Sequence, residues 1–135
     1  MRPGPPRGAT ATLEVTASSD VPAHHPEPHV YSTASLAADA EQVCRSLLLP
    51  HLDPDEMAVG VRLELLNRAP VPVGETVVLQ ATVASMEPNG LTCEVVARHR
   101  GTLVARGSYE QRVVRAAAFS TEVAGRGGVA GPTPA

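Results

Sequence analysis

The alternation of hydrophobic and polar residues along the chain predicts one strand, one long helix and then a run of strands. Residues 11–16 alternate between apolar and polar side chains, as in a strand with one buried face. Residues 20–30 contain several prolines and are expected to form an irregular loop. Ser32 or Thr33 then offers an N-cap for a helix that runs to about Leu49, where a proline ends it.

The apolar side chains of this helix gather on one arc of the helical wheel. At about 100° per residue the arc contains Leu36, Ala37, Ala40, Val43, Cys44, Leu47 and Leu48. Polar side chains occupy the opposite side, so the helix should pack with one face on a sheet.

Four further strands are expected after the helix, at about residues 57–67, 75–86, 91–100 and 102–115. Asn89-Gly90 is a strong hairpin signal, and Gly101 supports a second tight turn. This order of elements predicts an α+β fold in which an antiparallel β-sheet wraps around one long central helix.

The two ends of the chain differ from its middle. Gly and Pro concentrate in both ends, and neither end has the apolar periodicity that would offset the entropy lost on ordering. We therefore expect a flexible N-terminal tail at 1–10, one domain at 11–119 and a flexible Gly/Pro/Ala-rich C-terminal tail at 120–135.

Composition narrows the functional classes. The 135 residues include only two Tyr, one Phe and no Trp, and the formal net charge is −3. Nucleic-acid binders need stacking aromatics or a basic surface, so nucleic acid is not an expected partner. No run approaches the roughly 20 apolar residues of a membrane span, and the N-terminus does not resemble a signal peptide. We expect a cytoplasmic protein without a membrane partner.

The cysteines and basic residues add little about function. Cys44 and Cys93 form no CxxC pair and are expected to be buried thiols in a reduced compartment. All basic side chains other than histidine are Arg, which together with abundant Ala, Gly and Pro suggests a GC-rich, bacterial coding sequence.

Four short segments follow one another at characteristic spacings. They are Val30-Tyr31-Ser32-Thr33, Glu41 eight residues later, Ala58-Val59-Gly60 and Pro72-Val73-Gly74. Together they resemble the fluoroacetyl-CoA thioesterase-like family of hotdog-fold proteins, over about residues 13–119. The resemblance implies a single hotdog domain, a homodimer and an acyl thioester substrate. Coenzyme A or phosphopantetheine would enter as part of that substrate, with an acyl-carrier protein as the alternative carrier, and no cofactor or metal is expected.

The same resemblance implies an active site at the dimer interface, built from a Thr at the helix start, a Glu in the helix and a His on the next strand. Thr33 and Glu41 occupy the first two positions, and Asn67 stands at the third in place of His. We expect these three residues to be catalytic. The residues expected to contact the substrate are Gly60, His29 and Tyr31.

Two further segments depart from the family pattern. A later G-T-H-x-R motif reads Gly107-Ser108-Tyr109-Glu110-Gln111. The phenylalanines that gate the fluoroacetyl pocket should lie just before Val30, where this chain has Pro26-Glu27-Pro28-His29. Specificity for fluoroacetyl groups is therefore not expected.

Each catalytic candidate also has a structural interpretation. Glu41 lies at the margin of the apolar arc, where partial burial would raise its pKa and make it a better base, yet Glu41 and Arg45 also form a common i, i+4 ion pair. Thr33 is either a helix cap or a hydroxyl placed to polarise a carbonyl. Gly60 either admits a ligand close to the backbone or eases a strand bend.

Asn67 and the histidines leave further alternatives open. An amide can orient water or a thioester oxygen but cannot accept a proton as imidazole does, and Asn67 could also simply end a strand. His24 and His25 lack a third metal ligand at suitable spacing. His99, between two arginines, could meet the phosphates of coenzyme A or an acyl-carrier protein, or could be a solvated hairpin tip.

We therefore expect a thioesterase-like hotdog enzyme that hydrolyses a small or medium acyl-CoA or acyl-carrier-protein thioester, in secondary metabolism or self-resistance. The alternative is a protein that binds an acyl group or a product without hydrolysis, or a repurposed hotdog enzyme of cyclase or dehydratase type. Asn67 in place of His keeps this alternative open.

Overall fold

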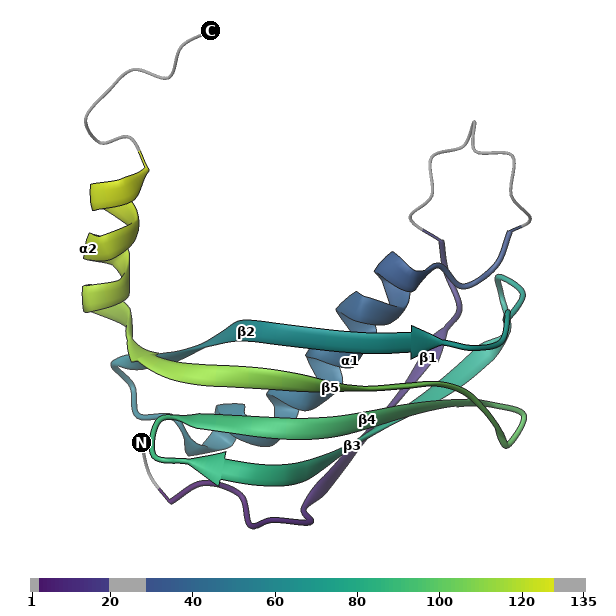
Figure 1. Cartoon of the computed structure of the whole chain (residues 1–135), viewed down its shortest axis with the longest axis horizontal. Helices are drawn as coiled ribbons and strands as arrows, with labels where there is room; N and C mark the ends of the chain where they lie inside the picture. The colour runs from purple at the N-terminus through teal and green to yellow at the C-terminus, as the bar shows by residue number, and fades with distance from the viewer. Residues whose placement is uncertain (1–2, 20–28, 128–135) are drawn as a thin grey trace, which may run out of the picture.

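The structure is a computed structural model and describes residues 3–19 and 29–127 (Figure 1). The elements, in chain order, are strand β1 (Thr10–Thr16), helix α1 (Thr33–Leu48), the 3-10 turn η1 (Leu49–His51), strands β2 (Glu56–Asn67), β3 (Thr76–Glu87), β4 (Gly90–His99) and β5 (Thr102–Arg115), and helix α2 (Ala116–Arg126). Their order follows the sequence-based expectation up to the end of β5.

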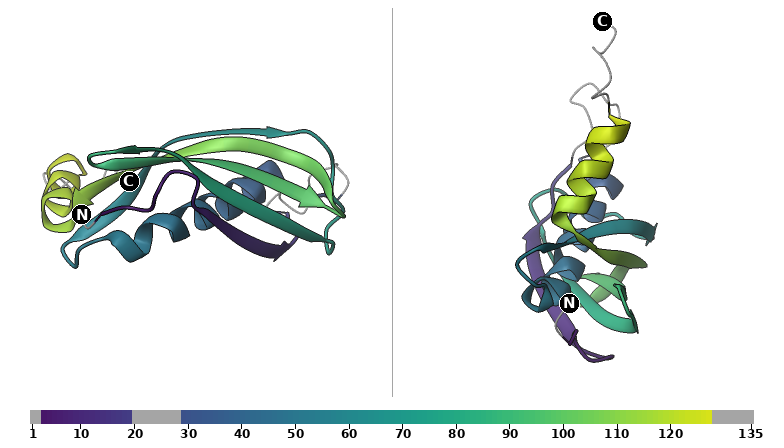
Figure 2. Two further views of the ribbon diagram at one scale, coloured as in Figure 1. Left: turned by 90° about the horizontal axis from the view of Figure 1, so that it is seen from below. Right: turned by 90° about the vertical axis from the view of Figure 1, so that its left-hand side faces the viewer.

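The five strands form one antiparallel sheet in the order β1-β3-β4-β5-β2. The sheet arches over α1, which lies along its inner face (Figure 2). The expected α+β architecture, an antiparallel sheet around one long helix, is therefore confirmed. Strand β2 forms one edge of the sheet and is paired only with β5 among the described strands.

The N-cap of helix α1 is Ser32, so the hydroxyl of the next residue, Thr33, does not serve as the cap. The Ser32 hydroxyl accepts a hydrogen bond from the backbone N–H of Ser35 at 3.1 Å, so Ser32 is the N-cap and the helix begins at Thr33. The predicted apolar arc is buried against the sheet, except that Ala37 at its margin is only half-buried.

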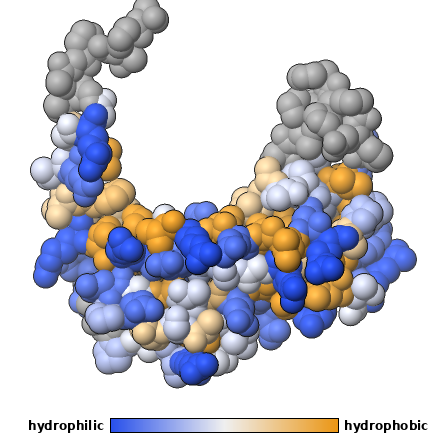
Figure 3. All heavy atoms as spheres, viewed as in Figure 1, coloured by the Kyte–Doolittle hydropathy of each residue, from blue (hydrophilic) through white to orange (hydrophobic). Residues whose placement is uncertain are grey.

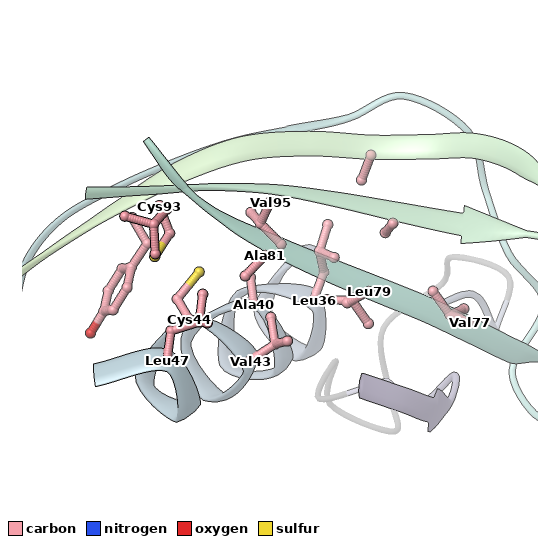
Figure 4. Packing of buried hydrophobic residues seen from close by; sticks show 14 of the residues in the cluster. Leu36, Ala40, Val43, Cys44, Leu47, Val77, Leu79, Ala81, Cys93 and Val95 are labelled. Atoms are coloured by element: carbon pink, nitrogen blue, oxygen red, sulfur yellow. The ribbon is translucent and has the colours of Figure 1, made fainter. Parts of the chain in front are cut away.

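The core between α1 and the sheet is filled by small and medium aliphatic side chains (Figure 4). Ala40 and Cys44 face Ala81 and Cys93 across the layer, and all four are fully buried. These short side chains let the helix approach the sheet closely. Cys44 and Cys93 are free thiols with their sulfur atoms turned toward each other, as the sequence predicted for buried cysteines.

Both predicted hairpins are present. Glu87 pairs with Gly90, so the two loop residues of the first hairpin are Pro88 and Asn89. Proline fixes the φ angle that the first loop position of an ordinary turn requires. At the β4–β5 hairpin, Arg100 and Gly101 both have positive φ, at 51° and 80°.

The expected N-terminal boundary needs correction. The N–H of Gly8 donates to the carbonyl of Val83, and the N–H of Val83 donates to the carbonyl of Ala9, so the chain joins the sheet before residue 11. Backbone pairing with an existing strand stabilises this segment although its side chains lack an apolar pattern.

The expected C-terminal boundary at residue 119 falls inside α2. Ala116–Ala118 favour a helix, whereas the glycines farther along dominate the composition of the segment. No residue of α2 is buried, and the helix projects from the end of β5 (Figure 1). Within the described residues, no helix is long and apolar enough to cross a membrane.

Opposite faces of β3 provide a test of the core. Leu79 faces α1 and is fully buried, whereas its neighbour Val78 faces outward and is exposed. Leu79→Ala should lower the free energy of unfolding by about 2–5 kcal/mol because it leaves a cavity in a packed core. Val78→Ala should cost less than about 1 kcal/mol. Urea denaturation measures both, and equal losses would contradict the assignment of the inner face.

Candidate active site

The candidate site lies along the line where α1 faces the edge strand β2, which we call the α1–β2 seam. On α1 it contains Thr33 at the start of the helix and, farther along, Glu41 and Arg45, which lie about one turn apart. On β2 it contains Gly60 and Asn67, whose side of the strand faces α1.

Thr33 and Asn67 come together at one end of the seam. The Asn67 Nδ2 donates a hydrogen bond to the Thr33 Oγ1 at 3.2 Å, across a separation of 34 residues in the sequence. Because Ser32 caps the helix, the Thr33 hydroxyl is not needed as a cap. Its oxygen accepts from Asn67, so its own proton remains available to donate to a ligand.

Glu41 lies farther along α1. Eight residues of helix separate it from Thr33, a distance of about 12 Å along the axis. The Glu41 Oε1 lies 3.8 Å from Arg45 Nη1, and its side chain is 46% exposed. The carboxylate is therefore half-buried in a single copy of the chain, and the alternative i, i+4 ion pair is present as well.

Gly60 adjoins a tyrosine that the sequence does not single out as a site residue. A Cβ built on Gly60 would overlap the Tyr109 hydroxyl oxygen and lie 2.9 Å from Tyr109 Cζ. Gly60 therefore makes room for Tyr109 beneath the edge strand. The altered G-T-H-x-R motif marks position 109 as unusual, but only the three-dimensional packing shows that its side chain reaches Gly60.

Burial raises the pKa of the Tyr109 hydroxyl above its usual range. The negative charge of Glu41 adds to this increase, and the Arg45 guanidinium opposes it. Tyr109 is therefore a neutral O–H group at pH 7, within the electrostatic reach of the Glu41–Arg45 pair.

The contacts of Tyr31 and His29 are with other residues than those of the α1–β2 seam. The buried Tyr31 hydroxyl donates to Asp39, and burial, reinforced by Asp39, raises the pKa of Tyr31. Asp39 precedes Glu41 by two residues, which places it about 200° away around the helix, on the opposite flank. His29 is exposed, and its carbonyl accepts from the N–H of Val73.

The β4–β5 hairpin tip is partly neutralised. His99 Nε2 lies 3.1 Å and Arg100 Nη2 lies 2.9 Å from the Glu75 Oε1. The His99 hydrogen bond and the nearby Arg100 hold the pKa of the Glu75 carboxyl below its usual range. The basic character expected for this tip is thus reduced by an acidic partner.

Two other features of the chain lie apart from the seam. A hollow on the outer face of the sheet is bordered by β2, β4 and β5 and includes Glu94 and Arg106 but none of the predicted site residues. Among residues 3–19 and 29–127, no three His, Cys, Asp or Glu side chains gather as a metal site. His24 and His25 lie outside the described residues.

The comparisons with known proteins agree on the fold. A family model described as fluoroacetyl-CoA-specific thioesterase matches residues 12–117. The fluoroacetyl-CoA thioesterase of Streptantibioticus cattleyicolor is 27% identical over 96 residues, 71% of this chain and 69% of that protein.

Solved structures extend this agreement. A thioesterase superfamily member from Thermus thermophilus has a TM-score of 0.83 at 26% identity, covering 90% of this chain and 92% of its own. A hot-dog-like protein from Thermanaerovibrio acidaminovorans has a TM-score of 0.84 at 26% identity, covering 92% and 94%. A solved fluoroacetyl-CoA thioesterase has a TM-score of 0.84 at 23% identity, covering 98% and 100%. The hotdog fold is confirmed.

The contact between Gly60 and Tyr109 can be tested by a double-mutant cycle. Gly60→Ala should lower the free energy of unfolding by about 1–3 kcal/mol because the added methyl group overlaps the hydroxyl. In the Tyr109→Phe background the loss should be smaller, since the nearest atom is gone. Chemical denaturation of the four proteins measures the coupling, and equal losses in both backgrounds would show that the two residues are not in contact.

Proposed function

The chain belongs to the family of fluoroacetyl-CoA-specific thioesterases, and on that premise we propose that it hydrolyses an acyl thioester of coenzyme A or of an acyl-carrier protein. The hydrogen bond between Asn67 and Thr33 is the observation that carries the proposal. It joins two of the three predicted catalytic residues, from a helix start and a strand end, at the open edge of the sheet.

Glu41 supplies the base in this proposal. Its carboxylate takes a proton from water as the water oxygen attacks the acyl carbon. The carbon–sulfur bond then breaks, the thiolate leaves and accepts that proton, and the products are a carboxylic acid and a free thiol. Thr33 donates a hydrogen bond to the substrate, and Asn67 holds the Thr33 hydroxyl in position.

The acyl group is proposed to be a small or medium one other than fluoroacetyl. The only phenylalanine of the chain, Phe119, lies in α2 rather than in the segment before α1. The aromatic gate implied by the family resemblance is therefore missing from its expected place, which favours a more open acyl pocket.

The edge strand β2 supports a homodimer. Its solvent-facing edge is unpaired within the described chain and carries the exposed apolar side chains of Val61, Leu63 and Leu66. Figure 3 shows hydrophobic atoms along the rim where Figure 1 draws β2. An exposed apolar edge strand is a template for pairing with another chain, and a second copy pairing there through a two-fold axis would cover it.

Such pairing would complete the site. Two antiparallel copies of β2 place the Asn67 end of one copy beside the first half of the strand in the other, where Gly60 lies. A substrate between the copies could then meet Glu41 of one protomer and the Thr33–Asn67 pair of the second. In this arrangement the substrate does not have to span the distance of about 12 Å along the helix axis between Thr33 and Glu41 of one chain. The second copy also covers the Glu41 carboxylate.

The Asn67 amide favours one other candidate function. It cannot accept a proton, so the fold could bind an acyl group or a pathway product without cleaving a thioester, or catalyse a cyclisation or dehydration. Tight ligand binding without thiol release would favour this candidate, as would an Asn67→His variant that gains hydrolysis.

Glu41→Gln tests the hydrolytic proposal on a panel of acyl-CoA substrates. The variant should release thiol about 10²–10⁴-fold more slowly, because the amide cannot act as a base. Its melting temperature should change little, since the exposed Glu41–Arg45 pair contributes little stability. The matched control is Glu94→Gln, an exposed carboxylate on the outer face of β4, which should keep the full rate. Equal rates for wild type and Glu41→Gln would refute the mechanism.

Leu66→Lys tests the dimer. Leu66 is the most exposed large apolar side chain on β2, at 54%, and a lysine there should oppose edge-to-edge pairing. Sedimentation should give twice the 14.0 kDa chain mass for the wild type and a dimer at least about tenfold weaker for the variant. Leu103→Lys, at the β4–β5 hairpin and 41% exposed, is the matched control and should remain dimeric. A monomeric wild type would contradict the proposal.

A further inference from the structure

Tyr109 presents a hydroxyl group in the core without a partner. Its side chain lies in the middle of β5, opposite Leu63 of β2 and Cys93 of β4, and is only 2% exposed. The hydroxyl oxygen is buried and has no hydrogen-bond partner of good geometry within the described residues, although the Arg45 guanidinium lies close enough to oppose the rise of its pKa. Buried hydroxyl groups are normally paired, so an unpaired one in a native protein calls for a ligand or a water.

A second unpaired polar atom lies at the next inward position of the same strand. Gln111 is 1% exposed and donates from Nε2 to the carbonyl of Cys44 at 3.1 Å, but its Oε1 has no partner in the described part of the chain. Gln111 is paired in register with Gly60. The floor of the α1–β2 seam is thus polar at two adjacent inward positions of β5, in a core that is filled mainly by aliphatic side chains.

The hydroxyl lies beneath the open edge of the sheet. It occupies the space that a Cβ of Gly60 would fill, and the β2–β5 register shifts between Gly60 and Arg62, where the strand bulges. Bulges commonly re-aim side chains and backbone next to functional sites. A ligand that reaches Gly60 from the edge of β2 therefore approaches the Tyr109 hydroxyl, which Arg45 also neighbours.

The charged groups around Tyr109 suit a hydroxyl that donates a hydrogen bond to a ligand. Glu41 and Arg45 are the charged groups whose fields act on it, and burial keeps the hydroxyl protonated. A neutral O–H beside a carboxylate base pairs a hydrogen-bond donor with the group that would activate water.

We propose that the Tyr109 hydroxyl donates a hydrogen bond to the carbonyl oxygen of the bound thioester, beside Gly60. This inference rests on the proposed function, because it assigns the donor that faces Glu41 across the reacting carbon. When water attacks, the carbonyl oxygen gains negative charge, and the fixed donor stabilises it without transferring its own proton. Gly60 is required because a side chain there would displace the Tyr109 hydroxyl from this position.

Tyr109→Phe tests this assignment by kinetics. Loss of one donor to a developing oxyanion should lower kcat by about 10²–10³-fold while KM changes less than about threefold. The melting temperature should not fall, because the lost hydroxyl has no partner in the folded chain. Ser108→Ala removes the hydroxyl of the adjacent residue, which faces the outer side of β5, and should keep the wild-type kcat. A Tyr109→Phe enzyme with kcat within about threefold of wild type would overturn the assignment.

A binding experiment separates this inference from the proposed hydrolysis. One probe is a ketone analogue of an acyl-CoA, in which a methylene group replaces the sulfur, and the other is an S-alkyl-CoA of equal length without a carbonyl. Calorimetry should show that Tyr109→Phe weakens the ketone about five- to tenfold and leaves the S-alkyl-CoA unchanged.

The outcomes are distinguishable. Suppose that the wild type cleaves no thioester, yet binds the ketone analogue more tightly than the S-alkyl-CoA and loses this preference in Tyr109→Phe. This result would refute the proposed hydrolysis and support Tyr109 as the hydrogen-bond donor. The role of Tyr109 as hydrogen-bond donor would be overturned, whether or not thioesters are cleaved, by either of two results. One is a Tyr109→Phe variant that binds both probes as the wild type does, and the other is a wild type that does not prefer the ketone analogue.

Discussion

The packing of α1 against the inner face of the arched sheet is the interaction on which the rest of the structure depends. Small side chains such as Ala40 and Ala81 meet at the centre of this contact and hold helix and sheet close together. Burial of one helical face determines where the other faces point. The part of α1 that carries Thr33, Glu41 and Arg45 is thereby directed along the edge strand β2, and a shallow seam remains there instead of a closed core.

The same edge links the chemistry to assembly. β2 has its inner side over Tyr109 and its outer rim in solvent, so whatever covers the rim also closes the seam. In one copy, Glu41 is half-exposed and distant from the Thr33–Asn67 pair. A second copy on β2 would desolvate the carboxylate and supply the missing end of the site, so activity and dimerisation should be inseparable in this protein.

The elements follow from the sequence where periodicity and turn residues are local. The start of α1, its buried arc and both hairpins are of this kind. Contacts between distant segments depend on three-dimensional packing, which no local pattern reveals. The contact between Gly60 and the Tyr109 side chain, which are not paired in register, is one example. Only the family resemblance predicted that Thr33 and Asn67 belong to one site. Helix α2 was missed because the alanines at its start favour a helix while the glycines beyond it resemble a tail.

A crystal structure of the protein with the ketone analogue of an acyl-CoA would test the proposed site most directly. We expect a dimer joined along β2, with the ketone oxygen within hydrogen-bonding distance of the Tyr109 hydroxyl and the carbonyl carbon facing Glu41. A ligand bound elsewhere, for example in the hollow on the outer face of the sheet, or a seam closed by Arg45 with no ligand beneath Gly60, would contradict it.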